Sequence, residues 1–365
     1  FYSANVDATT MRLQPLTAEE SDALLEALSG SLGSAFPPAL RELVTRCAGG
    51  NPFFLEEVIH SLSDTGVLIK DPQGVHCSVG SGNVTNLEIP STIQGIIHSR
   101  LDSLESGAKQ LLLEAAVIGP SFDLELLQQI TTRPRELQSL VETLLRADLL
   151  TESSWTGGRS SEYRFRNALI QEVAYNSLLK KRRAALHGTI ARTLERLHLA
   201  QLDDYLSQLA HHYSLSDDQE QAFHYLLRAG DKAARVYANQ DAISYYRRAL
   251  DIVEQQRDHL ALKAEVLEKL ADAHNASGEP EAARESWEAA LLLYETLQQK
   301  QRVAAIHRKI GLHWWGQGDR AQATAHLQRG LQLLTTTPEC VEAALLYQEL
   351  GRLSFRIGDD EQAIE

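Results

Sequence analysis

Apolar residues recur at helical spacing along most of the chain. In the segment PRELQSLVETLLRADLL they form one stripe along a helix, made of Leu137, Leu140, Val141, Leu144 and Leu145. Segments before about residue 70 show comparable patterns, as in TAEESDALLEAL, PPALRELVTRCA and PFFLEEVIHSLSDTG. The spacing therefore predicts a fold that is mostly α-helical.

Capping residues mark where the first helices begin and end. Thr17 and Glu20 form a capping box before the first helix. The pair Gly49–Gly50 ends the second helix, as glycines often do, and Asn51 caps the third. Residues 71–86 are rich in Gly and Ser, which predicts a loop or a weak hairpin.

The region 87–180 has the pattern of a winged-helix domain. Ser91 and Gln94 offer a capping box before STIQGIIHSRLDSL. Helical segments follow in AKQLLLEAAVIG, LELLQQI and PRELQSLVETLLRADLL. The alternating runs LLTESS and EYRFR then flank TGGRSS, which predicts a β-hairpin. Three helices followed by such a hairpin predict a winged helix.

Small residues recur with a period of about 40 residues in the last region. Gly278, Gly318 and Gly358 each follow a helical segment of the same character. Other small residues keep the same register, namely Gly230, Ala271, Gly311 and Gly351 before the turns, and Ala242, Ala283, Ala323 and Ala363 after them. These residues would let two antiparallel helices approach closely, with Tyr246, Trp287 and Leu327 filling the space beside them. The pattern predicts tetratricopeptide-like repeats, although their period exceeds the usual ~34 residues.

Composition and charge narrow the class of protein. The chain has 365 residues, 43% hydrophobic and 23% charged, which is typical of a soluble protein with two or three domains. We find no apolar run long enough to cross a membrane and no signal peptide, so we expect a cytoplasmic protein with no membrane partner. The net charge of −14 argues against direct nucleic-acid binding. A first residue other than Met, and a last repeat that stops within its second helix, suggest a longer protein.

Sequence patterns of catalysis are absent. There is no GxxxxGK[ST] loop, GxSxG or HExxH motif, and the cysteines Cys47, Cys77 and Cys340 lie far apart. His211 and His212 are adjacent, a poor arrangement for chelation, and we expect them on the surface. We therefore predict no catalytic residue and no metal site in this chain.

Two motifs at helix starts remain as candidate sites. The first, GGNPFFLEE, begins at Gly49, and the second, FRNALIQEVAYNSLLKKRRAALH, begins at Phe165. A helix N-terminus offers unpaired backbone N–H groups and partial positive charge, so it suits a capping side chain or an anion. Capping by Asn51 and Asn167 is sufficient from local physics, and an anion site is the alternative.

The order of the motifs resembles a known family. GGNPFFLEE, IPSTIQGIIHSRLDSL, AAVIGPSF, FRNALIQEVAYNSLL and helical repeats follow one another as in STAND-class P-loop ATPases of the AAA type. In bacterial signalling proteins of this class, tetratricopeptide repeats follow the ATPase module, and some members carry adenylate/guanylate cyclase or LuxR-type DNA-binding domains. The resemblance implies an upstream nucleotide core. It assigns a helical lid to residues 1–86 and a winged helix to 87–180, with connecting helices over 181–225 before the repeats of 226–365.

The same resemblance places nucleotide contacts on named residues. Gly50, Asn51 and Pro52 match the Gly-x-Pro turn of the lid, whose proline packs against adenine. Asn167 matches a histidine that contacts the β-phosphate of ADP from the winged helix, and Arg166 lies beside it. Asparagine can still donate a hydrogen bond but carries no charge. The resemblance thus implies ATP or ADP as cofactor of the full-length protein, held together with the upstream P-loop domain.

Three hypotheses about function follow. The leading one is a regulatory or sensor segment of a nucleotide-dependent signal-transduction ATPase, whose repeats bind a protein or small-molecule effector. The second is a passive repeat scaffold. The third is a transcription regulator that uses the winged helix on DNA. The predicted recognition helix mixes both signs of charge, which disfavours this third hypothesis, with Arg133, Arg135 and Arg146 against Glu136, Glu142 and Asp148.

Overall fold

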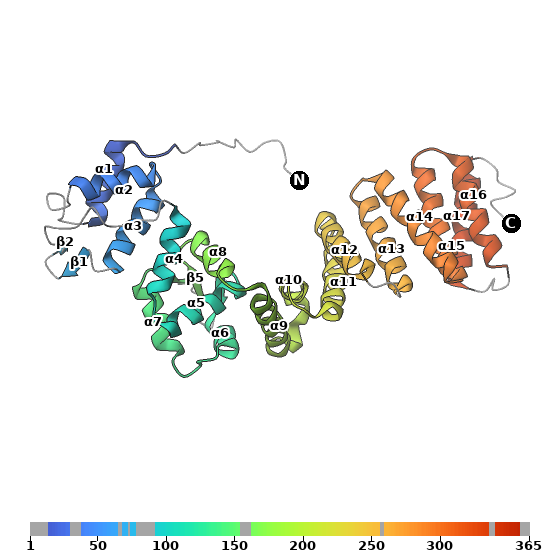
Figure 1. The fold of residues 1–365 in the computed structure, drawn as a ribbon. Helices are drawn as coiled ribbons and strands as arrows, with labels where there is room; N and C mark the ends of the chain where they lie inside the picture. Colours follow the sequence, from blue (N-terminus) through green and yellow to red (C-terminus); the bar gives the residue numbers. More distant parts are fainter. Residues whose placement is uncertain are drawn as a thin grey trace. The chain divides into compact units, whose positions relative to one another are not determined.

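The computed structural model describes residues 14–29, 38–64, 68–71, 74–77, 92–153, 162–255, 259–335 and 340–357. Most of these residues are helical (Figure 1). The chain divides into two compact units, Phe1–Arg183 and Ala184–Glu365.

The first unit begins with three helices whose ends follow the predicted caps. They are α1 (Ala18–Ser29), α2 (Pro38–Ala48) and α3 (Pro52–Asp64). In the capping box, the Glu20 N–H donates to Thr17 Oγ1 at 3.2 Å and the Thr17 N–H donates to Glu20 Oε2 at 2.8 Å. Both glycines after α2 adopt positive φ, +55° at Gly49 and +78° at Gly50. The three helices share one apolar core, which includes Leu25, Val44, Leu55 and Val58 and extends to Ile96 of the fourth helix.

A short hairpin and a fourth helix follow. The hairpin pairs β1 (Leu68–Asp71) with β2 (Gly74–Cys77), so it begins before the predicted loop, while residues 78–91 lie outside the described part. The capping box predicted at Ser91 is not the cap of α4 (Ile93–Ser103). Thr92 takes this place, and its Oγ1 accepts from the Gly95 N–H at 3.2 Å. Ser and Thr are both favoured N-cap residues, so the sequence alone does not separate these neighbours.

The remaining elements of the first unit combine three helices with a three-stranded sheet. The helices are α5 (Ser106–Ile118), α6 (Leu124–Ile130) and α7 (Leu137–Arg146), and the strands are β3 (Ser121–Asp123), β4 (Leu150–Ser153) and β5 (Glu162–Phe165). The sheet is antiparallel with β5 in the centre, in the order β3-β5-β4. The order along the chain is helix, strand, two helices and two strands. The winged-helix assignment of residues 87–180 stays a prediction. The helix α8 (Ala168–Asn176) follows β5.

Two details of this region differ from the prediction. Strand β3 was not predicted, because three residues between Pro120 and α6 are too few to show alternation; its pairing with β5 places Phe122 opposite Tyr163. The helix predicted to begin at Pro134 begins at Leu137, after a turn in which the Glu136 N–H donates to the Arg133 carbonyl at 3.1 Å.

The second unit is an array of helices packed in chain order (Figure 1). It begins within α9 (Lys180–Leu197), and a 3₁₀ helix η3 (Leu199–Tyr205) and α10 (Leu206–Ser214) follow. Antiparallel pairs follow: α11 (Gln219–Arg235) with α12 (Asn239–Glu254), α13 (Leu260–Ala276) with α14 (Pro280–Thr296), α15 (Lys300–Gly316) with α16 (Arg320–Leu333), and then α17 (Val341–Ile357). The protein is therefore mostly α-helical, with tetratricopeptide-like helical repeats forming a solenoid.

Small residues let the two helices of a repeat approach, as predicted. A Cβ added at Gly230 would lie 2.5 Å from Cε1 of Tyr246, and one added at Gly311 would lie 3.0 Å from Cγ of Leu327. Tyr246 is 2% exposed, so its ring has no room to retreat. Gly278 and Gly318 end their helices at φ +78° and +85°. The predicted positions Gly358 and Ala363 lie outside the described residues.

Within the described part, no helix combines the length and apolar character needed to cross a membrane.

Candidate functional site

The turn before α3 is built by local hydrogen bonds. Asn51 Oδ1 accepts from the N–H of Phe53 at 3.0 Å and of Phe54 at 3.4 Å, so it caps the helix that Pro52 begins. Gly50 has positive φ, and a Cβ at this position would lie 2.5 Å from the carbonyl oxygen of Leu16. That glycine's own carbonyl accepts from the Leu16 N–H at 2.8 Å. Glycine is thus required here by backbone geometry.

The start of α8 has an equivalent cap. Asn167 Oδ1 accepts from the Leu169 N–H at 2.8 Å. The backbone of Asn167 is extended, at φ −142° and ψ 145°, as usual for an N-cap. Capping therefore accounts for Asn51 and Asn167, while the amide NH₂ of each can still act as a donor.

Arg166 joins the two predicted motifs. Its Nη2 lies 2.8 Å from Oε1 of Glu56, one turn along α3 from Pro52, and its Nη1 lies 2.9 Å from Oδ1 of Asp148. The hydrogen bond to Glu56 raises the pKa of Arg166 above its usual value. The structure thus brings Arg166 to the helix that the Gly50-Asn51-Pro52 turn begins. Its guanidinium is already bound to two carboxylates, so an anion would have to compete with them.

A buried ion pair lies beside this contact. Arg100 Nη1 is 2.6 Å from Glu57 Oε2, and both side chains are 2% exposed. Arg100 Nη2 also donates to the Ala147 carbonyl at 2.5 Å, at the end of α7. Burial raises the pKa of Glu57 by more than the charge of Arg100 lowers it. The pair links α3, α4 and α7 in one polar contact.

A second candidate site lies on the repeats. Asp231 of α11 accepts from the Tyr246 hydroxyl at 2.7 Å and from Lys269 Nζ at 2.8 Å. One repeat later, Asp272 of α13 accepts from Trp287 Nε1 at 3.0 Å and from Lys309 Nζ at 2.6 Å. Each aspartate therefore binds an aromatic side chain of its own repeat and a lysine of the next.

These sets of Asp, aromatic and Lys side chains were not predicted from the sequence. The aspartates directly follow the small residues Gly230 and Ala271, and the two lysines keep the same repeat spacing. Comparing charged positions between repeats, in addition to small ones, would have found the pattern. Burial and the bond to Asp231 raise the pKa of Tyr246, so this hydroxyl remains a donor at neutral pH.

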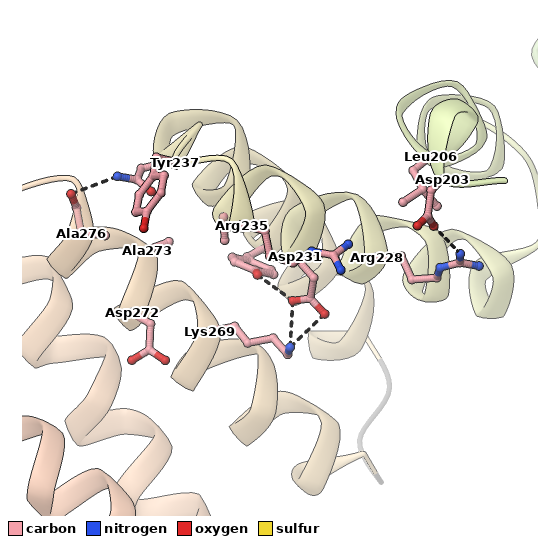
Figure 2. Close-up of a pocket in the computed structure, with 13 residues that line it drawn as sticks. Asp203, Leu206, Arg228, Asp231, Arg235, Tyr237, Lys269, Asp272, Ala273 and Ala276 are labelled. Atoms are coloured by element: carbon pink, nitrogen blue, oxygen red, sulfur yellow. Dashed lines mark hydrogen bonds and ion pairs between the residues drawn. The ribbon is translucent and has the colours of Figure 1, made fainter. Parts of the chain in front are cut away.

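Pockets lie next to these sets. A pocket of about 560 Å³ is lined by residues of η3, α10, α11, α12 and α13 and of the turn between α11 and α12. In Figure 2, Asp231 and Lys269 lie in its middle, Asp203 and Arg228 at one end, and Tyr237 near Ala276 at the other. A second pocket, of about 510 Å³, is lined by the corresponding residues of the next repeat. Asp272 lines both pockets, which makes them neighbours along one groove.

The prediction of surface histidines at 211 and 212 was wrong for one of them. His212 is 3% exposed, and its Nδ1 lies 2.9 Å from Nδ1 of His187. Burial, together with His187 and His211, lowers the pKa of His212 to about 3, so the ring is neutral. Among the described residues, no group of three or more His, Cys, Asp or Glu side chains is arranged to hold a metal ion.

Comparisons with known sequences give two matches. A family model described as a domain of unknown function, DUF8739, matches residues 17–76. An uncharacterized protein of Rhizobium meliloti (strain 1021), R02095, is 29% identical over 267 residues. This match covers 72% of the chain but 24% of the relative, so the chain spans about a quarter of that protein's length.

Several solved structures have a similar arrangement of helices. A signal transduction ATPase with numerous domains (STAND) and a tetratricopeptide repeat sensor, from Pyrococcus horikoshii, is 11% identical with a TM-score of 0.35, covering 95% of this chain and 58% of that one. A Rap protein in complex with competence and sporulation factor is 12% identical with a TM-score of 0.39, covering 74% of each chain. At these scores the likeness is distant, and the fold class rests on the helices and repeats of the chain itself.

Proposed function

We propose that this chain is the regulatory segment of a nucleotide-dependent signalling ATPase. In this proposal the first unit faces a nucleotide held by a P-loop domain of the full-length protein. The repeats of the second unit bind a protein or small-molecule effector. Effector binding would shift the balance between ADP-bound and ATP-bound states if it favours one of them.

The observation that carries the proposal is the contact between Arg166 and Glu56. Residues 110 positions apart in sequence meet at 2.8 Å, so the side chain of Arg166, which precedes α8, reaches α3, whose first residue is Pro52. These are the two elements that the family resemblance assigns to adenine and phosphate contacts. A nucleotide phosphate arriving near Asn167 would find a guanidinium that can exchange carboxylates for phosphate oxygens.

Substitutions at Asn167 test the proposal in the full-length gene product. Asn167→Asp keeps the oxygen that caps α8 but replaces the amide donor by a negative charge. Asn167→His introduces the family residue. We expect a fluorescent ADP analogue to dissociate faster from the Asp variant and more slowly from the His variant than from wild type.

A matched control separates a nucleotide contact from a cap. Arg135→Ala changes an exposed arginine before α7 and should leave ADP dissociation unchanged. If Asn167→Asp and Asn167→His also leave it unchanged while the protein stays folded, Asn167 is only a cap and the nucleotide-facing role is wrong.

A passive repeat scaffold is the second candidate function. It is favoured by the fact that Arg166 and the Oδ1 atoms of Asn51 and Asn167 already have partners within the chain. Under this hypothesis the full-length gene product would contain no GxxxxGK[ST] loop and would retain no nucleotide after purification.

A further inference from the structure

The first repeat differs from the next ones at the turn between its helices. Tyr237 occupies the position of Gly278 and Gly318, and like them it has positive φ, +60°. Glycine adopts this conformation without penalty, whereas a side chain with Cβ is strained in it. Yet the Tyr237 side chain is 85% exposed, so it does little for the core. A strained, exposed aromatic residue on the rim of a pocket indicates a role outside folding.

A second difference lies two residues earlier. Arg235 lines the same pocket, and the corresponding residue one repeat later is Ala276. Arg235 is exposed and makes no ion pair in the part of the chain that the structure describes. The two repeats therefore differ at two corresponding positions. The first repeat has Arg235 and Tyr237, whereas the second has the small residues Ala276 and Gly278.

The charges of the pocket indicate which ligand would suit it. Asp203 is paired with Arg228 at 3.0 Å, and Asp231 with Lys269 at 2.8 Å. Asp272 is bound to Lys309 at 2.6 Å. The carboxylates are therefore neutralised within the chain, whereas the guanidinium of Arg235 remains available. An acidic group complements this pocket better than a basic one.

The shape indicates an elongated ligand. Asp272 lines both pockets, so the groove runs across two repeats. Stacked helical repeats present such extended surfaces to linear segments of partners. A compact small molecule would fill one pocket and leave the other empty.

We propose that this groove holds an extended peptide segment of a partner protein, with an acidic side chain paired to Arg235 and an apolar side chain packed on Tyr237. The inference rests on the proposed partner-binding role of the repeats and specifies its chemistry. In an extended chain, side chains two positions apart point to the same side, so the acidic and apolar residues should be spaced in this way.

Synthetic peptide pools test the proposal on the 365-residue chain. We use three fluorescein-labelled pools that differ only at a central residue, which is Glu in the first, Gln in the second and Lys in the third. In every pool a Leu or Phe stands two positions after this central residue. Fluorescence anisotropy measures their affinity. We expect the Glu pool to bind at least about tenfold more tightly than the Gln pool, with the Lys pool weakest.

Two variants locate the contact. Arg235→Ala should abolish the preference for Glu over Gln. Tyr237→Gly should weaken binding of every pool while raising the melting temperature, because it relieves the strained turn. Arg247→Ala and Tyr347→Ala, at exposed positions on α12 and α17, should bind the pools as wild type does.

Several results would overturn the proposal. They are equal binding of the Glu and Gln pools, a preference for Lys, no binding of any pool, and affinities insensitive to both variants. None of these measurements involves a nucleotide, so a failure of the ATPase assignment would be seen separately, in ADP dissociation.

Discussion

The ion pair between Arg100 and Glu57 provides a sharp test of the first unit's stability. Both side chains are 2% exposed and meet at 2.6 Å, so neither charge is screened by water. Arg100→Met replaces the arginine by an unbranched apolar side chain, which resembles its aliphatic part but lacks the guanidinium. The Glu57 carboxylate is then buried without its cation. Breaking a buried pair in this way typically costs about 3–5 kcal/mol, and we expect a destabilisation in this range at neutral pH.

The cost should depend on pH in a direction that the structure determines. The pKa of Glu57 is already raised by burial, and loss of Arg100 should raise it further. A group whose pKa is raised on folding destabilises the fold where it is ionised, and this penalty disappears on protonation. The deficit of Arg100→Met should therefore shrink as the pH falls from about 8 to about 5, by at most about 1.4 kcal/mol per pH unit.

Urea-dependent hydrogen exchange of the α4 amides measures the free energy of unfolding of this unit separately from the repeats. The matched variant Glu57→Met/Arg100→Met removes both charges and should recover most of the lost stability, since apolar pairs often replace buried ion pairs at little cost. A deficit below about 1 kcal/mol, or one independent of pH, would refute this account of the pair. A double variant no more stable than Arg100→Met would also contradict it.

Two further predictions concern the repeats. Gly230→Ala should destabilise the second unit by about 1–2 kcal/mol, because its Cβ would lie 2.5 Å from the buried Tyr246 ring. Gly316→Ala, whose Cβ would have nothing within 4 Å, should stabilise the unit by up to about 1 kcal/mol. Urea unfolding followed by tryptophan fluorescence compares the two variants, and equal effects would refute the packing argument. The pKa of His212, about 3, lies below the unfolded value of about 6.5, so its stabilising contribution exists above pH 6.5 and is lost as the pH falls. The unit should lose at most about 1.4 kcal/mol per pH unit in this window from this group, and His212→Phe should flatten the slope; an unchanged slope would show that His212 is not responsible.

The features predicted correctly from sequence depend on neighbours in the chain. The capping box of Thr17 with Glu20 and the cap at Asn51 need only adjacent backbone N–H groups. The period of about 40 residues was visible because small residues recur at the same positions, where the two helices of each repeat pack closely. Strand β3 was missed because its residues show their role only when β5 pairs with them.

The candidate site shows the same limit. Sequence and resemblance named Arg166 and Asn167, but no local pattern indicated that Arg166 would bind Glu56 and Asp148. Likewise, adjacency suggested surface histidines, whereas His212 is buried because packing of α9 against α10 brings it to His187. The partners of a charged side chain and the burial of a histidine depend on contacts between residues distant in sequence. A single sequence does not show these contacts directly.

By itself, the amino-acid sequence determined where most of the helices lie, how α1, α3 and α8 are capped and that the second half consists of repeats, because hydrophobic spacing and caps act over a few residues. Only the tertiary structure decided which charges are neutralised and which remain available. The ion pair of Asp231 with Lys269 joins α11 to α13, so it forms only when consecutive repeats stack, and the pocket beside Arg235 and Tyr237 includes residues of both repeats. The electrostatics of the groove thus depend on side chains that meet in space.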